Sequence, residues 1–409
     1  MDGRRVVLGV SASIAAYKAV AIASQLTQQG ALVDVIMTPE AAELVRPLSF
    51  EAITHRPVAF EMFRLIDSEI AHVALARSAD VFLVAPATAH TIAKLAIGLA
   101  DDLVSATALS CQAPQLLAPA MESGMWQHPA TVDHVKTLRE RGWTIVEPGV
   151  GHLASGAVGE GRLAEPEQIV DVTKHVLARG GDLAGWRVTI TAGGTREPLD
   201  PVRFLSNRSS GKMGLALAEA ARDRGADVTL IWTSGADSVP HGVQLVEVEQ
   251  AEEMRAAVLA ALPRTDLLVM AAAVADYRPA EAVGQKIKKA SGMLALDLAP
   301  TVDVLQEVSK VRGPDDRTIV VGFAAETESV LDNARKKLVD KRLDLVVAND
   351  VTIQGSGFGS DFNQVSILQE GEPDIDLPLL PKIEVAHHVY DAVLRMSGAS
   401  RDPSAEFRA

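Results

Sequence analysis

Polar and basic side chains gather in one stretch in the middle of the chain, residues 191–214, which read TAGGTREPLDPVRFLSNRSSGKMG. The stretch follows an apolar run and precedes a segment of helical period, so it joins a strand end to a helix start. Ser209 and Ser210 at that helix start could hold an anion, because the first amides of a helix have no partners within it. The spacing fits neither a Walker A motif nor Gly-x-Gly-x-x-Gly. An anion site and an elaborate structural loop both remain open.

More charged residues follow later strand ends. Asp276 follows one such end, Lys286 lies in QKIKKASG (285–292), a segment that could close as a lid, and Lys337 and Lys341 share one face of an expected helix from 328. A charge run on a helix is usually only a solvated face. In a chain with a formal net charge of -14, however, separate cationic clusters at strand ends favour a site for a triphosphate and its metal.

Small and hydroxylated residues follow the strands expected in the first half of the chain. Ligands of open α/β sheets bind beyond the carboxyl ends of the strands, so these positions could surround a cofactor. Structural turns, helix N-caps and a core stripe are the alternative interpretations. The residues are Gly9, Ser11 and Ser13 after the first strand, Thr38 after the second, Thr88 and Ser105 after the third, and Met121, Met125 and Trp126 after the fourth.

His72 is a candidate proton carrier. It lies in SEIAHVALARSAD (68–80), which is expected to form a helix capped by Ser68. From spacing alone, a histidine on a helix is more often structural than catalytic.

The elements that must position these residues alternate along the chain. Short apolar runs alternate with longer segments of helical period, which is typical of βαβ units on a parallel sheet buried on both faces. The pattern then restarts, which predicts two Rossmann-like open-sheet α/β domains. The expected strands are 4–10, 32–37, 80–85 and 115–118, then 186–192, 227–232, 243–248, 266–273, 318–325 and 343–350, and the expected helices are 14–29 and those starting near 68, 88, 211, 251 and 328.

Length and composition agree with two domains. A chain of 409 residues exceeds what one core usually supports. The Gly-rich stretch 178–185 is the best candidate for a boundary, and it predicts domains 1–180 and 181–409.

The net charge and the cysteine content limit the classes of partner and the compartment that we expect for this protein. The acidic balance argues against nucleic acid and anionic membrane surfaces, and the longest apolar runs are too short for a membrane helix. The single cysteine, Cys111, cannot form an internal disulfide and is expected in the core. A cytoplasmic protein with small-molecule partners is expected.

Taken together, the first four strand exits resemble the flavin-dependent cysteine decarboxylases, a family of flavodoxin-like flavoproteins, over residues 4–175. The resemblance implies FMN as cofactor. His72, in His72-x-x-Leu75-x-x-x-Ala79-Asp80, would be the catalytic histidine. The implied flavin contacts are Gly9, Ser11, Ser13, Thr38, Thr88, Ser105 and Met121.

Two positions depart from that family. Its substrate loop reads Pro-x-Met-Asn-x-x-Met-Trp, whereas this chain has Glu122 where the Asn stands, followed by Met125. An amide can donate to a substrate carboxylate, but an ionised Glu cannot, so Glu122 must be protonated, turned away or replaced in that role. Ser155 stands where the family's flap carries a proton-donating Cys, and a hydroxyl is a far weaker acid than a thiol.

The second half resembles phosphopantothenate–cysteine ligase. The motifs are TAGGT at 191–195, AAVADY at 272–277, KIKK at 286–289, VGFAAET at 321–327 and Asn349-Asp350. The resemblance implies CTP as co-substrate, Mg2+ held by Asp276, Asn207 in contact with an acyl-cytidylate, and Lys286 stabilising the charge that develops. The other implied substrate and nucleotide contacts are Ser209, Ser210, Ala272, Asp276, Asp303, Phe323, Lys337 and Lys341.

The two halves together resemble the bifunctional bacterial enzymes of coenzyme A biosynthesis. The resemblance implies that 4'-phosphopantothenate is condensed with cysteine at the expense of CTP, and that the product is then decarboxylated to 4'-phosphopantetheine. It also implies a homo-oligomer, a dodecamer built from trimers of the flavin half and dimers of the ligase half. An active ligase fused to an impaired decarboxylase and a non-catalytic flavoprotein regulator are the alternatives.

Overall fold

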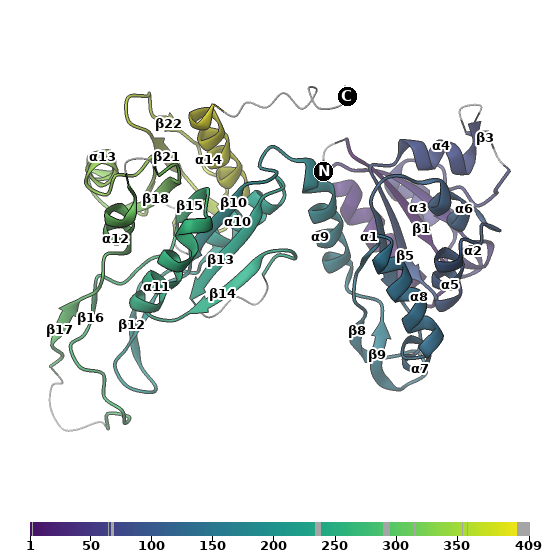
Figure 1. Cartoon of the computed structure of the whole chain (residues 1–409), viewed down its shortest axis with the longest axis horizontal. Coiled ribbons are helices and arrows are strands. Elements are labelled where there is room, and N and C mark those ends of the chain that lie inside the picture. The colour runs from purple at the N-terminus through teal and green to yellow at the C-terminus, as the bar shows by residue number, and fades with distance from the viewer. Residues whose placement is uncertain are drawn as a thin grey trace. The chain divides into compact units, whose positions relative to one another are not determined.

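The computed structural model describes residues 1–409 except 2, 64, 67–68, 234–238, 289–294, 314–315, 354, 358 and 399–409. The chain forms two compact units, Met1–Leu177 and Ala178–Ala409, each with its own sheet (Figure 1). Within the described ranges, no helix is long and apolar enough to cross a membrane.

The first unit is built on a parallel sheet with the strand order β2-β1-β5-β6-β7. Apolar runs form its central strands, and every residue of β5 is buried. The strands are β1 Arg5–Val10, β2 Leu32–Met37, β5 Val81–Ala87, β6 Gln115–Pro119 and β7 Thr144–Ile145.

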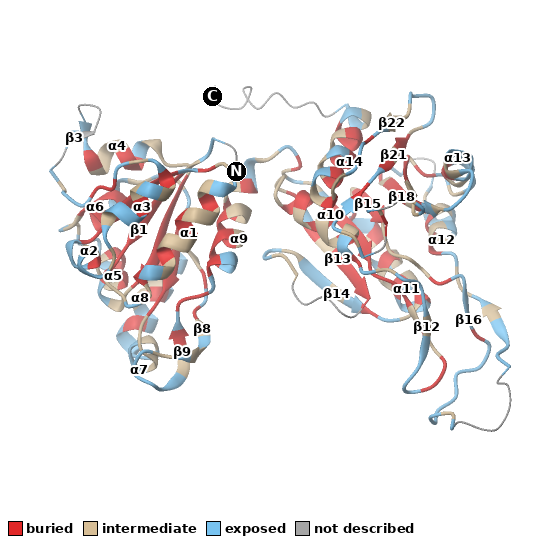
Figure 2. Ribbon diagram, turned by 180° about the vertical axis from the view of Figure 1, so that it is seen from behind, coloured by how far each residue is buried: buried red, intermediate tan, exposed pale blue. Residues whose placement is uncertain are grey.

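Helices cover both faces of this sheet, and each face has an apolar core (Figure 2). The core of one face includes residues of α1, α3 and α9, and that of the other face includes residues of α4, α5, α6 and α8. The helices are α1 Ala16–Gln28, α2 Pro39–Leu44, α3 Pro47–Thr54, α4 Ala71–Ser78, α5 Ala89–Ile97, α6 Leu103–Ser110, α7 Ser123–Trp126, α8 Pro129–Glu140 and α9 Pro166–Leu177. Two small hairpins, β3 Leu65–Ile66 with β4 Glu69–Ile70 and β8 Gly149–His152 with β9 Val158–Arg162, complete the unit.

The second unit has a larger sheet with the order β14-β13-β10-β15-β18-β19-β21-β22. Pairing is parallel from β14 to β19 and antiparallel beyond β19. The strands are β10 Arg187–Ala192, β13 Asp227–Thr233, β14 Gln244–Val248, β15 Leu267–Met270, β18 Ile319–Glu326, β19 Leu345–Asp350, β21 Val365–Leu368 and β22 Ile375–Asp376.

The helices of the second unit are divided between the two faces of its sheet. Helices α10 and α14 pack side by side against one face, and the core of the other face includes residues of α11, α12 and α13. The helices are α10 Lys212–Arg222, α11 Ala251–Ala261, α12 Val304–Val311, α13 Val330–Asp340 and α14 Lys382–Ser397. Short turns of 3-10 helix lie at η1 Ala178–Gly180 and η2 Leu262–Arg264. Hairpins are formed by β11 Arg196–Pro198 with β12 Phe204–Ser206, by β16 Tyr277–Pro279 with β17 Leu298–Pro300, and by β20 Phe362–Asn363 with β23 Leu380–Pro381.

The Gly-rich stretch 178–185 packs on the second unit. The amide of Leu183 donates to the Arg224 carbonyl at 2.9 Å, and the Leu183 side chain is fully buried. A Cβ on Gly181 would lie 2.2 Å from that same carbonyl oxygen. Close backbone packing therefore explains at least one glycine that composition alone suggested was a linker residue.

The sequence predicted the alternation and the two open sheets correctly, and some element bounds less well. The helix expected from about residue 68 begins at Ala71, and its expected cap, Ser68, lies outside the described residues. The strand expected at 266–273 is shorter, Leu267–Met270. The antiparallel strands β21 and β22 and the small hairpins were not predicted, because they are too short to show periodicity.

Candidate active sites

Hydrogen bonds join the carboxyl ends of three neighbouring strands in the first unit. The Ser11 hydroxyl donates to the Pro86 carbonyl at 2.8 Å and accepts the Thr88 amide at 3.0 Å. The Thr38 amide donates to the Val10 carbonyl at 3.0 Å. The structure thus places the expected flavin residues Ser11, Thr38 and Thr88 at one edge of the sheet, and it uses the Ser11 hydroxyl to join two strand exits.

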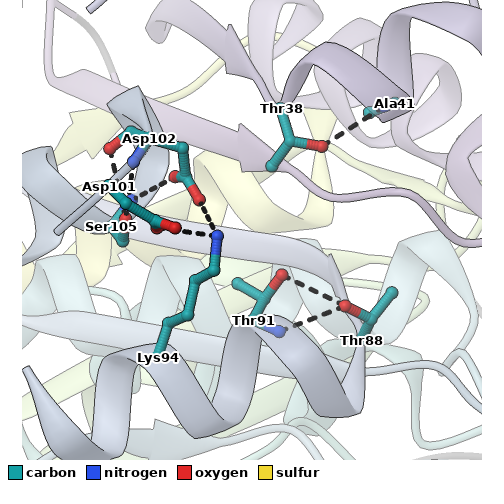
Figure 3. A network of polar contacts seen from close by, with 8 residues as sticks. All are labelled: Thr38, Ala41, Thr88, Thr91, Lys94, Asp101, Asp102 and Ser105. Carbon is teal, nitrogen blue, oxygen red and sulfur yellow. Dashed lines mark hydrogen bonds and ion pairs between the residues drawn. The ribbon is translucent and has the colours of Figure 1, made fainter. Parts of the chain in front are cut away.

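Several of the expected hydroxyls also cap helices. Thr38 accepts the Ala41 amide and Thr88 accepts the Thr91 amide, each at 3.2 Å (Figure 3). Ser105 forms a reciprocal capping box with Asp102 at the start of α6. The N-cap interpretation and the cofactor interpretation are compatible for Thr38, because its hydroxyl accepts one bond and keeps a proton to donate.

Two residues of the first exit have local roles as well. The Ser13 hydroxyl accepts the Ala15 amide at 3.2 Å. A Cβ on Gly9 would lie 3.0 Å from Val104 Cγ1, so the glycine lets α6 pack closely on β1.

Lys94 was not singled out from the sequence. Its ammonium group lies 2.7 Å from Asp101 and 2.8 Å from Asp102, and it joins α5 to the segment that precedes α6 (Figure 3). Burial lowers the pKa of Lys94, but the two carboxylates outweigh it and the net pKa is raised. Lys94 therefore stays protonated and fixes the capping box that holds Ser105.

His72 lies in the first turn of α4, and its Nδ1 atom is buried without a hydrogen-bond partner. Helix α4 packs against α6, the helix that carries Ser105. Because the far end of α4 leads into β5, its first turn lies toward the carboxyl edge of the sheet. A buried ring nitrogen without a partner is uncommon and marks His72 as a candidate functional group.

The loop after β6 is held by the β8–β9 hairpin. The Met121 amide donates to the Gly161 carbonyl at 2.9 Å, and the Ser123 hydroxyl donates to the Glu160 carbonyl. The Glu122 carboxylate accepts the Gly124 amide at 2.6 Å as the N-cap of α7. In the structure, then, the Glu122 carboxylate serves as a helix cap. Met125, on α7, is about half exposed.

Ser155 lies exposed in the turn of the β8–β9 hairpin. Its hydroxyl accepts the Ala157 amide at 3.4 Å, and in the described part of the chain it makes no hydrogen bond to His72. Cys111 is half-buried against the core, where burial raises the pKa of its thiol. Cys111 is therefore a poor substitute for the missing proton donor.

The second unit contains a cavity of about 690 Å³ at the carboxyl edge of its sheet. It joins the mouth of α10 to the ends of β15 and β18 and to one face of α13. The expected site residues that line it are Asn207, Ser209, Ser210, Ala272, Asp276, Asp303, Phe323, Lys337 and Lys341.

Hydrogen bonds to backbone carbonyls hold Asn207 beyond the end of β15. The Asn207 side-chain amide donates to the Val274 carbonyl at 3.0 Å, and the Ala273 amide donates to the Gly193 carbonyl at 2.8 Å. Gly193 has a φ of 89°, and a Cβ there would lie 2.0 Å from the Thr233 hydroxyl. A glycine at position 193 therefore lets the chain turn closely past β13 and bring Asn207 to the cavity.

Lys337 is the most unusual charge in this cavity. Its ammonium group donates to the Phe323 carbonyl at 2.7 Å, and burial lowers its pKa, although carboxylates of Glu326 and Asp303 act in the opposite direction. Lys341 forms an ion pair with Asp303 at 2.5 Å. A desolvated ammonium group gains more from an added anion than an exposed one does, so α13 is well suited to bind phosphate groups.

Asp276 is exposed at the cavity, and its backbone carbonyl accepts the Thr301 amide at 2.9 Å. In the described ranges, no three carboxylate, histidine or cysteine side chains are grouped as a metal site. Asp276 thus offers a single carboxylate at the cavity, and proteins often bind Mg2+ through one or two carboxylates together with substrate phosphates.

Lys286 does not line the described cavity. It is exposed on the segment between β16 and β17, where the next residue, Ile287, accepts a bond from Arg203 at 2.9 Å and donates one to Asp200 at 3.1 Å. The pKa of Asp200 is strongly lowered by its bond to Arg203. The structure thus ties the expected lid to the β11–β12 hairpin, and Lys289 lies outside the described residues.

Comparison with known proteins identifies the family. The flavoprotein family model matches residues 1–178, and the model of the DNA/pantothenate metabolism flavoprotein C-terminal domain matches residues 183–396. The coenzyme A biosynthesis bifunctional protein CoaBC of Bacillus subtilis is 43% identical over 97% of this chain and 98% of its own length. The chain belongs to the CoaBC family. The CoaBC protein of Mycobacterium tuberculosis strain H37Rv is 45% identical over 96% of both chains.

Solved structures match each half. The C-terminal domain of a CoaBC protein is 38% identical, covers 53% of this chain and 98% of its own, and has a TM-score of 0.46. A PPC decarboxylase cysteine-to-serine mutant complexed with pantothenoylaminoethenethiol is 31% identical, covers 42% and 97%, and has a TM-score of 0.39. The expectation of a bifunctional CoaBC enzyme of coenzyme A biosynthesis, a flavoprotein decarboxylase joined to a ligase, is confirmed.

Some cavity residues were missed by the sequence reasoning. Asn349, Asn363 and Lys382 line the cavity, although only the Asn349-Asp350 pair stood in a quoted motif. Lys212 also lines the cavity, and its ammonium group pairs with Asp361 at 2.6 Å. A lysine before a helical run was the one visible signal for Lys382, and a lysine there is commonplace.

Proposed function

We propose that the cavity of the second unit condenses 4'-phosphopantothenate with cysteine at the expense of CTP. The observation that supports this proposal is one cavity that joins Asn207, the mouth of α10 and the lysines of α13. The test is CTP-dependent release of pyrophosphate that requires 4'-phosphopantothenate.

In this proposal the triphosphate lies against α13. The ammonium groups of Lys337 and Lys341 offset the charge that develops as pyrophosphate leaves, and Asp276 would hold Mg2+, which would supply further positive charge. Ala272 and Phe323 border the nucleotide, and Asp303 keeps Lys341 in place through their ion pair.

The acyl group is proposed to meet Asn207. The carboxylate of 4'-phosphopantothenate attacks the α-phosphorus of CTP and displaces pyrophosphate, and the amine of cysteine then displaces CMP from the acyl-cytidylate. The Asn207 amide donates one proton to Val274 and keeps a second to donate to the acyl group. Ser209 and Ser210 add hydroxyls at the mouth of α10 for an anionic group of the substrates.

The first unit is proposed to bind FMN at the edge formed by Ser11, Ser13, Thr38 and Thr88, with Gly9, Ser105 and Met121 nearby. The residues fit this cofactor, because the Thr38 hydroxyl keeps a proton to donate and the first amides of α5 have no partners within the helix, which suits a phosphate and ribityl chain. When bound there, FMN would supply reversible two-electron redox chemistry at the thiol-bearing carbon, so that loss of CO2 needs no external oxidant.

His72 is proposed to hold and move the proton of the substrate thiol. Its Nδ1 atom is buried without a partner and can take either role in a hydrogen bond. Glu122, fixed as a cap, orders the loop that carries Met125.

An active ligase fused to an impaired decarboxylase is the second candidate. Ser155 favours this candidate. It is exposed in a hairpin turn, at the position where the flavin-dependent cysteine decarboxylases carry a proton-donating cysteine.

Replacing Ser155 by cysteine (Ser155→Cys) is expected to speed formation of 4'-phosphopantetheine about tenfold or more, because a thiol donates a proton far more readily. Product formation from 4'-phosphopantothenoylcysteine measures this, with Ser155→Ala as the control that should bring no gain. An unchanged rate for the cysteine variant would show that another group donates the proton.

Replacing Lys286 by glutamine (Lys286→Gln) is expected to slow pyrophosphate release about 100-fold, because the lid loses the charge proposed to stabilise the transferring phosphate. The exposed neighbour Lys288 provides the control Lys288→Gln, which is expected to change the rate much less. Equal rates for Lys286→Gln and the unmodified protein would remove Lys286 from the site.

The remaining expectations belong to this proposal. Exposed apolar side chains on the β11–β12 and β16–β17 hairpins, among them Phe204, Tyr277 and Leu298, support a homo-oligomer. A dodecamer in the cytoplasm is the assembly expected from the family resemblance.

A further inference from the structure

A buried lysine at the edge of the ligase cavity has no role in the reaction proposed above. Lys382 is only 7% exposed, and it is the first residue of the 16-residue helix α14. A positive charge at the N-terminus of a helix opposes the helix dipole, and burial adds a desolvation cost. The position is therefore unfavourable for a lysine unless its surroundings compensate.

The compensation comes from a ring of backbone carbonyls. The Lys382 ammonium group donates to the carbonyls of Gly357 at 3.2 Å and Phe362 at 3.3 Å, and also to that of Ser360. We call these three oxygens the carbonyl cage. An ammonium group has three donors, and the cage offers three acceptors, whereas a neutral amine would leave one carbonyl unsatisfied.

The carbonyl cage belongs to a strap, residues 355–363, which the structure describes except for Phe358. The Asn363 side chain accepts the Gly357 amide at 3.2 Å, and Asn363 pairs with Leu380 in the β20–β23 hairpin. Gly357 and Asn363 line the ligase cavity. Whatever fixes the strap therefore shapes one wall of the cavity.

The strap's carboxylate does not serve Lys382. Asp361 pairs with Lys212, the first residue of α10, which also donates to the Gly359 carbonyl at 3.1 Å. Burial lowers the pKa of Lys382, and the charge of Lys212 acts in the same direction, whereas Asp361 opposes both. Backbone carbonyl oxygens thus surround this cation, much as carbonyl oxygens replace the hydration shell of a monovalent metal ion in a channel filter.

We propose that Lys382 is a positioning residue that acts as a built-in monovalent cation: its ammonium group fills the carbonyl cage and so holds the strap, with Gly357 and Asn363, against the ligase cavity. The proposal deepens the ligase function and rests on it. It assigns Lys382 no contact with the reacting atoms.

The test is replacement of Lys382 by alanine with an added amine. Lys382→Ala leaves room for the three carbons and the nitrogen of propylammonium. Pyrophosphate release is expected to fall about tenfold or more, because the three oxygens of the carbonyl cage lose their partner. Propylammonium chloride is expected to restore much of the loss, and 1-propanol, a neutral analogue of similar shape, is not.

Three controls make the result specific. Lys310→Ala, which removes an exposed lysine paired with Glu307, is expected to keep its rate with or without the amine. Decarboxylation of supplied 4'-phosphopantothenoylcysteine is expected to be unchanged in Lys382→Ala. Thermal unfolding gives a readout independent of turnover, because propylammonium should raise the unfolding temperature of Lys382→Ala and not that of the unmodified protein.

The outcomes separate the two proposals. A full rate for Lys382→Ala, or a loss that propylammonium reverses in neither activity nor unfolding temperature, overturns the role of Lys382. If the unmodified protein releases no pyrophosphate, the ligase function fails instead, and the unfolding measurement still decides whether the cage takes up a cation.

Discussion

Replacing Lys337 by methionine (Lys337→Met) is expected to slow CTP-dependent pyrophosphate release about 100-fold or more, because the cavity loses a desolvated cation beside the triphosphate. The fold should tolerate the change. Burial already lowers the pKa of Lys337, so removal of this charge relieves a desolvation cost. Steady-state pyrophosphate release and thermal unfolding measure the two effects separately.

The control for this prediction lies one residue away. Lys336 is exposed on the same helix, and Lys336→Met is expected to keep nearly the full rate. The pH dependence gives a further check. Because only the ammonium form attracts phosphate, CTP affinity should fall as pH rises through the lowered pKa of Lys337, below the usual lysine range. A rate for Lys337→Met within twofold of the unmodified protein would rule out the proposed triphosphate site on α13.

Replacing His72 by asparagine (His72→Asn) is expected to slow CO2 release from 4'-phosphopantothenoylcysteine about 100-fold or more, because asparagine cannot carry a proton between groups near neutral pH. The flavin content of the purified protein and its pyrophosphate release should stay unchanged, because the ligase cavity belongs to the other unit. CO2 release under conditions of saturating substrate measures the effect.

His55 provides the matched control for that prediction. It is exposed and has a φ of 56°, a left-handed conformation that asparagine tolerates well. His55→Asn should therefore keep its decarboxylase rate. Loss of bound flavin in His72→Asn would assign the histidine to cofactor binding, and an undiminished CO2 rate would remove it from the catalytic machinery.

Local patterns allowed much of the site to be predicted from the sequence. Thr38 and Thr88 stand before helical segments, and both are N-caps in the structure. Lys337 and Lys341 are four residues apart, a spacing that brings Lys337 on α13 and Lys341, its C-cap, to the same cavity. The parallel sheet allowed the remaining site residues to be grouped, because the carboxyl ends of its strands lie at one edge.

Long-range contacts explain what could not be predicted. Lys382 and Asn363 reach the cavity through the antiparallel pairing of β20 with β23, two strands of two residues each. Lys212 lies at the mouth of α10 and is bound by Asp361, 149 residues further along the chain. Neither partnership leaves a periodic signal in the sequence.

The most direct test of the central claim is a two-product measurement on one purified protein. The protein is supplied with CTP, Mg2+, 4'-phosphopantothenate and cysteine labelled in its carboxyl group, and both pyrophosphate and labelled CO2 are counted. The account predicts one CO2 for each pyrophosphate once the intermediate has reached steady state. Sustained pyrophosphate release without labelled CO2 from flavin-loaded protein would contradict it.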